Sequence, residues 1–134
     1  MKVLRSILAV IAGAILGGFA NGFLIKISGS IIPPPPGVDT QTEEGLKAGI
    51  HLFEPKHFLF PFLAHAIGTL LGAIIASLIS KYEKGRPAYV VGALFLIGGI
   101  MMVVMIPAPI WFSAADLILA YIPMAYLANK ITKK

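Results

Sequence analysis

Apolar residues fall into four long runs along the chain, and polar residues gather in the segments between these runs. The runs are approximately Val3–Ile27, Phe58–Ser80, Ala88–Ile106 and Ile110–Ala128. Each is close to the ~20 residues that an α-helix needs to cross a hydrocarbon core of about 30 Å. Because lipid offers the backbone no hydrogen-bond partner, such a run crosses a membrane as a helix. The pattern therefore predicts an all-α, polytopic membrane protein, a bundle of four transmembrane helices that forms one domain over residues 1–134.

The three connections between the runs differ in length and polarity. The third and fourth runs are separated by little more than Pro107–Pro109, so they should form an antiparallel hairpin. The second and third are joined by the short basic segment KYEKGRP at residues 81–87. The first connection is a long polar loop over about residues 28–57, which begins with the stiff proline run Pro33–Pro36.

The second half of this long loop has the pattern of a short amphipathic helix. Thr40 and Glu43 have the spacing of a capping box at a helix start. Apolar residues follow at helical spacing, polar residues fill another face, and Pro55 ends the pattern. We expect this helix to lie on the outer membrane surface. Its apolar positions are Leu46, Ile50 and Phe53, and its polar positions are Lys47, His51 and Glu54.

Composition agrees with a membrane protein and narrows its possible partners. Hydrophobic residues make up 57% of the chain and charged residues 13%, and the mean hydropathy of +0.88 is too high for a soluble fold. The net charge of +5 comes from short basic clusters between apolar runs, so no nucleic-acid partner is expected. The chain has no cysteine, which excludes disulfides and thiolate sites. The first apolar run exceeds the roughly 7–15 residues of a signal-peptide core, so we expect it to stay as a helix.

Lysine and arginine positions predict the orientation in the membrane. Basic residues cluster before the first run, between the second and third, and after the fourth, which are all on one side of a four-pass protein. Cytoplasmic segments carry such an excess, so both termini should be cytoplasmic and the long loop should lie on the outer side. The clustered residues are Lys2, Arg5, Lys81, Lys84, Arg86, Lys130, Lys133 and Lys134.

Small residues recur every four positions in the first two predicted helices. Such stripes allow helix backbones to approach closely in a membrane. We expect these two helices to pack on each other or on copies in a homo-oligomer. The stripes are Ala9, Gly13, Gly17 and Asn21, and Ala64, Gly68, Gly72, Ala76 and Ser80.

Three polar residues on different helices fall at nearly the same predicted depth. Helix rise places Asn21, His65 and Asp116 about 7, 10 and 9 Å inside the hydrocarbon boundary. Polar groups at such depth face the bundle interior or a wet cavity. We therefore expect His65 and Asp116 to lie within hydrogen-bond reach. Other interpretations remain open. Asn21 is the rival partner of these residues, or it only forms a hydrogen bond between helices. Asp116 follows Ser113 by three residues, so the two could only form the capping box of the fourth helix.

The histidines and acids of the outer side suggest hydrolytic chemistry. His51, Glu54 and His57 have an HxxExxH spacing, and with His65 they are candidate ligands for zinc or a similar divalent ion. A bound metal could activate water for hydrolysis. The candidate catalytic residues are Glu54, His65 and Asp116, with Glu43 and His51 as alternates. No elbow motif marks Ser28, Ser30 or Ser113 as a nucleophile.

Two stretches resemble a known group of proteins. They are Leu63–Ala73, LAHAIGTLLGA, and Ile106–Leu127, IPAPIWFSAADLILAYIPMAYL. From about His57 onward the chain resembles a family of small bacterial four-helix integral membrane proteins. The resemblance implies the fold and a bacterial inner membrane, and it implies no reaction.

Three functions fit this pattern. The first is a protease-like hydrolase that is embedded in the membrane and acts at its outer face, either with a metal or without one. The second is a small ion- or proton-coupled transporter or channel, in which His65 and Asp116 would relay protons. The third is a non-catalytic membrane subunit with the outer loop as its docking surface. A peptide, a lipid or an ion could each be the substrate.

Overall fold

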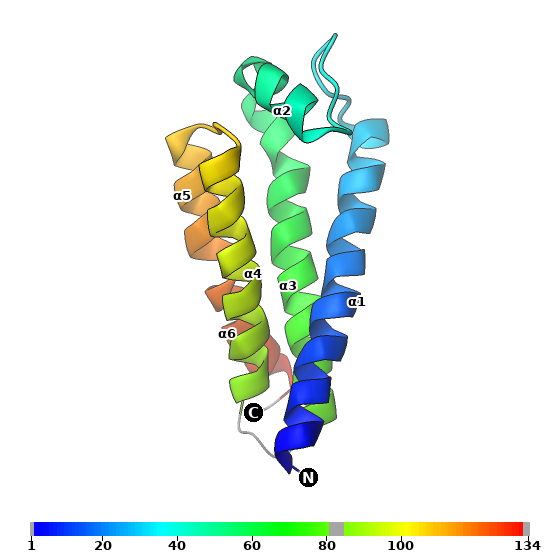
Figure 1. Ribbon diagram of the computed structural model, residues 1–134, viewed down its shortest axis with the longest axis vertical. Helices are drawn as coiled ribbons and strands as arrows, with labels where there is room; N and C mark the ends of the chain where they lie inside the picture. Colours follow the sequence, from blue (N-terminus) through cyan, green and yellow to red (C-terminus); the bar gives the residue numbers. More distant parts are fainter. Residues whose placement is uncertain (1, 81–84, 133–134) are drawn as a thin grey trace.

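A computed structural model describes residues 2–80 and 85–132, and its regular elements are all helical in this part of the chain. Four helical segments are long and apolar enough to cross a membrane, which fits the predicted membrane protein (Figure 1). Both ends of the described chain lie at one end of the bundle, called the terminal end, and residues 32–58 cover the opposite end, the loop end. The elements are α1 (Lys2–Ile31), α2 (Glu43–Gly49), η1 (Ile50–Leu52), η2 (Pro55–Phe58), α3 (Leu59–Ser80), α4 (Arg86–Met105), α5 (Ile110–Leu119) and α6 (Ile122–Ile131).

The predicted boundaries hold for the second and third runs and need correction for the other two. The first helix continues to Ile31 instead of ending near Ile27. The fourth predicted helix is broken into α5 and α6 at Ala120 and Tyr121. Pro123 explains the break, because it has no N–H to donate to the carbonyl of Leu119 four residues earlier.

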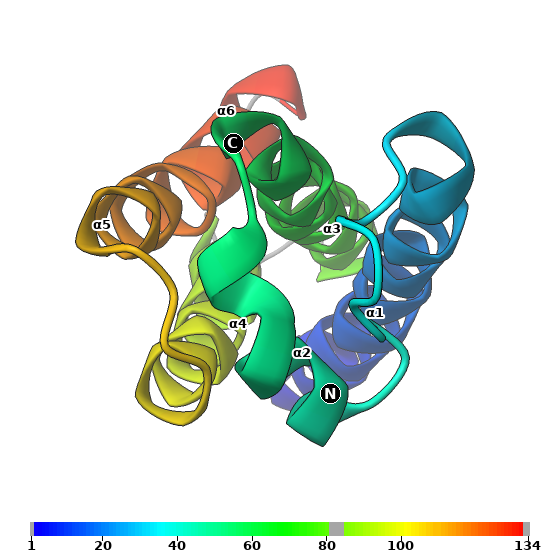
Figure 2. The same ribbon diagram turned by 90° about the horizontal axis from the view of Figure 1, so that it is seen from above.

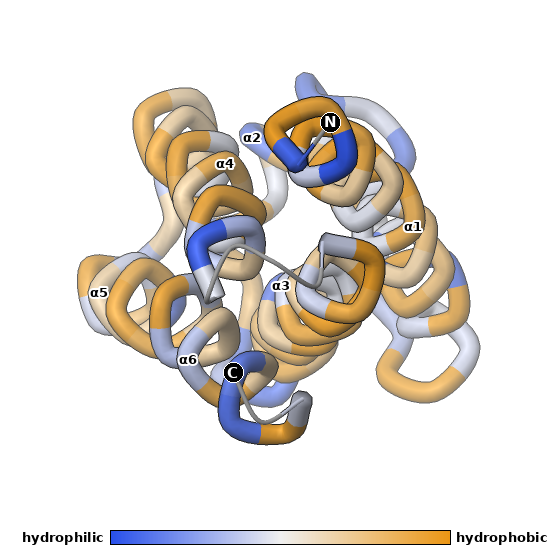
Figure 3. Tube along the Cα trace, turned by 90° about the horizontal axis from the view of Figure 1, so that it is seen from below, coloured by the Kyte–Doolittle hydropathy of each residue, from blue (hydrophilic) through white to orange (hydrophobic). Residues whose placement is uncertain are grey.

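This bundle buries small side chains and exposes large apolar ones, which is the opposite of a water-soluble bundle. Buried positions are mostly alanine, glycine and serine, whereas large apolar side chains point outward. Phe19, Val104 and Ile110 are 72%, 81% and 87% exposed. Seen from the terminal end, most residues along the helices are hydrophobic, and hydrophilic residues lie mainly near the helix ends (Figure 3). Such a surface is suited to contact with lipid chains instead of water.

The small-residue stripes bring the backbones of α1 and α3 into contact within one chain. A Cβ atom added at Gly13 would lie 2.3 Å from the carbonyl oxygen of Gly72, and one added at Gly17 would lie 2.5 Å from that of Gly68. Alanine has no room at either position. The structure therefore accounts for the stripes by packing inside the chain, and the homo-oligomer stays a prediction.

A buried polar cluster joins α3, α4 and α6 near the terminal end. The Ser77 hydroxyl donates to the Asn129 side-chain oxygen at 3.2 Å, and the Asn129 amide donates to the Gly85 carbonyl at 3.1 Å. Gly85 adopts a left-handed conformation with φ of 87°, which glycine tolerates without strain. Ser77 and the Thr132 hydroxyl also lie 2.9 Å apart. This cluster fixes the start of α4 against α6.

The long loop folds over the loop end as a helical cover. Figure 2 shows α2 lying across the end of the bundle. The helix begins at Thr42, whose hydroxyl accepts from the Gly45 N–H at 2.9 Å, so the predicted cap at Thr40 is wrong by two residues. Its predicted apolar residues pack with Phe58, Ile106 and Phe112. The apolar face of this amphipathic segment thus packs on the protein, and its place at the membrane surface stays a prediction.

The α1–α3 contact predicts opposite effects at two neighbouring glycines. Gly17→Ala should destabilise the bundle by about 1–3 kcal/mol, because the added methyl group would push the two helices apart. Gly18 is the matched control, since a Cβ there meets nothing within 4 Å. Gly18→Ala should be neutral or slightly stabilising, as alanine is the better helix former. Thermal unfolding in detergent, followed by circular dichroism, measures both. Equal melting temperatures would show that α1 does not pack on α3 through this stripe.

Candidate functional site

A cavity of about 700 Å³ opens in the half of the bundle nearest the loop end. Its walls come from α1, α3, α4 and α5, and the cover formed by α2, η1 and η2 lies over it. This volume is in the range of small-molecule binding sites. Asn21, His65 and Asp116, the three polar residues predicted at one depth, all line it.

His65 on α3 and Asp116 on α5 form a close pair at this cavity. The His65 Nδ1 atom lies 2.8 and 2.9 Å from the two carboxylate oxygens of Asp116. Asp116 is only 3% exposed, and the His65 side chain is 23% exposed. The predicted contact is therefore confirmed. The capping interpretation of Asp116 is wrong, because α5 begins after Pro109 without any side-chain cap.

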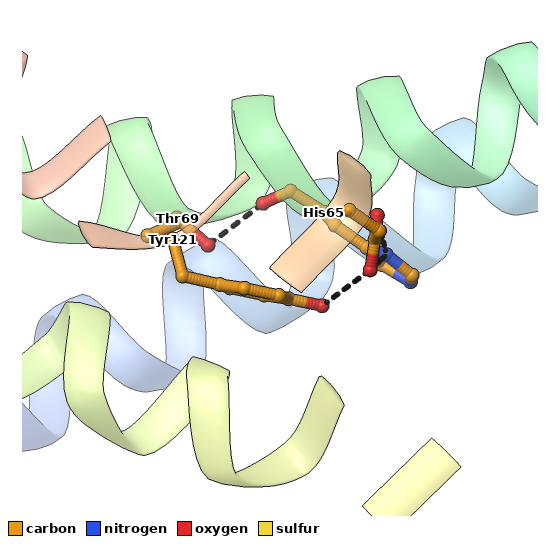
Figure 4. A network of polar contacts seen from close by, with 4 residues as sticks. His65, Thr69 and Tyr121 are labelled. Atoms are coloured by element: carbon orange, nitrogen blue, oxygen red, sulfur yellow. Dashed lines mark hydrogen bonds and ion pairs between the residues drawn. The ribbon is translucent and has the colours of Figure 1, made fainter. Parts of the chain in front are cut away.

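Tyr121 is a third member that the sequence reasoning missed. Its hydroxyl donates to Asp116 Oδ2 at 3.2 Å, and its ring stacks on that of His65 with centroids 5.9 Å apart (Figure 4). In an unbroken helix, residues five apart point about 140° away from each other. The break before Pro123 removes this restriction and lets Tyr121 turn back toward Asp116. The proline was the signal that could have revealed this contact.

A glycine on α4 makes room for the tyrosine ring. A Cβ atom added at Gly99 would lie 2.6 Å from the Tyr121 hydroxyl oxygen and 2.8 Å from its ring. On the other side of the site, the Thr69 hydroxyl donates to the His65 carbonyl at 2.7 Å and satisfies its own polar group within α3. Tyr121, which packs against Gly99 of α4, thus helps to fix Asp116 beside His65.

The contacts of His65 define the state of its two ring nitrogens. A carboxylate accepts hydrogen bonds, so Nδ1 carries the proton that faces Asp116. In the neutral ring this leaves a lone pair on Nε2, and the described residues offer Nε2 no hydrogen bond. His65 also lines the cavity. The geometry is that of an imidazole oriented by a carboxylate, with its second nitrogen available to a ligand.

Asn21 reaches the same cavity from α1. A Cβ added at Gly68 would lie 2.9 Å from the Cβ of Asn21, which places Asn21 about one helical turn from His65. The side-chain oxygen of Asn21 is buried and has no hydrogen-bond partner among the described residues. Buried polar atoms normally have partners, so this amide is suited to hold a bound group. Asn21, the rival partner, is not bonded to Asp116.

The remaining predicted site residues lie in the cover and have local contacts. The Glu54 backbone N–H donates to His57 Nδ1 at 2.8 Å, which makes His57 part of the start of η2. Glu54 and Glu43 are exposed and pair with Lys56 and Lys47, each at 3.7 Å, and His51 is also exposed. His57 alone of the two outer histidines lines the cavity.

A metal site does not form from these outer residues in the described part of the chain. Among residues 2–80 and 85–132, no three histidine, aspartate or glutamate side chains gather closely enough to hold an ion. The suggested ligands His51, Glu54, His57 and His65 are therefore not brought together as one group. Zinc binding and a catalytic role for Glu54 both stay predictions.

Comparisons of the chain with protein-family models, with curated proteins and with solved structures found no match. The function is therefore argued from the site itself. The resemblance of Leu63–Ala73 and Ile106–Leu127 to bacterial four-helix proteins stays an expectation.

The hydrogen bonds predict opposite tautomers for two histidines of the same protein. His65 donates through Nδ1, so its neutral ring should carry the proton on Nδ1. His57 accepts through Nδ1, so its neutral ring should carry the proton on Nε2. Nitrogen-15 chemical shifts of labelled protein in micelles distinguish these forms, and His65→Gln and His57→Gln assign the signals. Finding the proton of neutral His65 on Nε2 would contradict the pairing with Asp116.

Proposed function

We propose that the protein is a membrane-embedded hydrolase in which His65 is the general base. The observation that carries this proposal is the hydrogen bond from His65 Nδ1 to the buried Asp116 carboxylate, at the wall of a cavity. A carboxylate that orients an imidazole and stabilises its protonated form is the arrangement that proton-transfer catalysis uses. The Tyr121 hydroxyl and the Gly99 contact hold the carboxylate in place.

The proposed reaction is hydrolysis of an acyl bond by water. His65 Nε2 takes a proton from a water molecule as its oxygen attacks the carbonyl carbon. The tetrahedral intermediate then collapses, the bond to the leaving group breaks, and His65 returns the proton to that group. The Asn21 amide carries two N–H donors that can stabilise the developing oxyanion. Asp116 stays ionised throughout and offsets the charge on the imidazolium.

The membrane setting follows from the four apolar helices and from the position of the site. His65 lies six residues inside α3, so about 9 Å below its first residue. An aspartate at such depth costs a few kcal/mol on insertion scales unless it is paired or hydrated. The pair with His65 and the cavity meet that need. We propose a bacterial inner membrane, which the resemblance implies, with the loop end outside, as the basic residues predict.

The arrangement of polar groups favours a one-sided site over a transport path. The cluster around Ser77 lies twelve residues along α3 from His65, which is about 18 Å. A packed apolar layer separates the two polar clusters, and it includes Ala73, Ala76 and Val91. A transporter would have to open this layer in each cycle. A hydrolase needs access from the loop end only.

Ester hydrolysis by purified protein tests the proposal. With p-nitrophenyl octanoate in detergent, His65→Gln and Asp116→Asn should each lower the rate by about 100-fold or more, the range for loss of a general base. His51→Gln is the matched control, since it removes an exposed imidazole away from the cavity and should keep full activity. Melting temperatures confirm that each variant is folded.

The opposite pattern would identify a different site. If Glu54→Gln abolishes hydrolysis while His65→Gln leaves it intact, the metal-type site of the outer loop is responsible. If the wild type shows no hydrolysis above the buffer rate, the hydrolase proposal is wrong.

A further inference from the structure

The cavity lining carries its lysines near the loop end, under the cover. Two lysines, Lys26 of α1 and Lys56 of η2, line it there. Lys26 forms no ion pair with the described residues, and Lys56 makes one exposed contact of 3.7 Å with Glu54. The carboxylate of Asp116 is already bonded to His65 and Tyr121. This end of the cavity therefore favours an anionic group.

Helix rise gives the order of these groups along the cavity. Asn21 is level with Gly68, and α1 and α3 run in opposite directions. Lys26 is therefore about 7 Å nearer the loop end than Asn21, and His65 is about 4 Å nearer. Lys56 lies farther out, nine residues before His65. The lysines thus lie nearest the loop end of the cavity, the free imidazole nitrogen lies below them, and the unpartnered amide oxygen lies deepest.

Apolar residues of α1 and α4 form one side of the cavity. Phe95 of α4 reaches Gly17 of α1, and a Cβ added there would lie 3.1 Å from the ring. Nearer the loop end, both helices line the cavity, and several lining residues are also exposed on the outer surface. These exposed residues are Gly22, Ile25, Met102 and Val103. In a membrane, these exposed residues would face the acyl chains of the bilayer.

We propose that the substrate is the acyl ester of an anionic glycerophospholipid, an assignment that rests on the proposed function. The phosphate binds Lys26 and Lys56, and the ester carbonyl lies at His65. The acyl chain leaves between α1 and α4. In such a lipid the nearest ester carbonyl carbon is about 6 Å from phosphorus, since single bonds are about 1.5 Å long. This length is comparable with the ~3–7 Å of helix rise that separates Lys26 from His65 and Asn21.

The chemistry of the step is complete with water as the second reactant. Water supplies the hydroxyl that becomes part of the released fatty acid, and the ester bond between the acyl carbon and the glycerol oxygen breaks. The proton that His65 accepts passes to the glycerol oxygen, which leaves as the hydroxyl of a lysophospholipid. No oxidant or second cosubstrate is required.

A lipid suits these walls better than a peptide does. A peptide would bring backbone N–H and C=O groups between α1 and α4, where apolar side chains and lipid offer them no partners. An acyl chain has no such groups. The fixed distance between the phosphate and the ester is also comparable with the distance along the bundle between Lys26 and His65.

Selective binding to an inactive protein tests the assignment. Full-length His65→Gln in detergent is mixed with equal amounts of phosphatidylglycerol and phosphatidylcholine of the same chains, and native mass spectrometry counts the bound lipid. Phosphatidylglycerol should be preferred about threefold or more, as expected for a pair of partly exposed charges. Adding Lys26→Gln should remove the preference, and adding Lys26→Arg should keep it. Lys47→Gln is the matched control, because Lys47 lies in the cover without lining the cavity.

Each alternative has its own result. Equal binding of the two lipids, with p-nitrophenyl octanoate hydrolysis intact, would overturn the lipid assignment and leave the hydrolase standing. If inorganic phosphate displaces phosphatidylglycerol with an affinity equal to that of the lipid, the site binds phosphate without a role for the acyl chain. That result would also overturn the lipid assignment. Release of fatty acid from phosphatidylglycerol by the wild type, and not from a matched peptide substrate, is the expected outcome. Release of the peptide product alone would contradict it.

Discussion

The structure depends on how the carboxylate of Asp116 is accommodated inside an apolar bundle. A buried ionised carboxylate is stable only when hydrogen bonds replace the water that it has lost. In this bundle the imidazole of His65 and the hydroxyl of Tyr121 take that place. Both contacts have structural requirements: the break between α5 and α6 turns Tyr121 inward, and Gly99 leaves space for its ring. The hydrogen bond between His65 and Asp116 also orients the imidazole, as the proposed proton transfer requires.

The close packing of α1 and α3 determines where the cavity can form. Glycine stripes hold the two backbones together from Gly13 to Gly17, and the apolar layer below the site fills the centre of the bundle. Past Gly17, α1 carries Asn21 and then Lys26 along one side of the open space. The cover formed by α2, η1 and η2 lies over the remaining side. The two halves of the bundle thus differ: the half near the termini packs tightly, and the other half contains the cavity.

Much of the fold and the central contact could be predicted from sequence. Hydrophobic runs found the four spans because the membrane constrains every residue in a span, and equal depth identified His65 and Asp116 as neighbours. Tyr121 was missed because an unbroken helix was assumed across Pro123, and helical spacing then points Tyr121 away. The packing of the cover on the protein was not predicted, because an apolar helix face looks the same whether it meets lipid or protein. The charge pattern predicts that the termini are cytoplasmic and that the loop end is outside. The described contacts do not test this orientation.

The central claim is that His65 and Asp116 act as one catalytic unit, and a double-mutant cycle tests it most directly. The rate constant for hydrolysis of p-nitrophenyl octanoate is measured for wild type, His65→Gln, Asp116→Asn and the double variant. If Asp116 acts only through the imidazole of His65, the double variant should be about as slow as His65→Gln alone, since residues that act as a unit are strongly non-additive. If the two losses multiply, Asp116 acts independently of His65, and the claim of a single catalytic unit is contradicted.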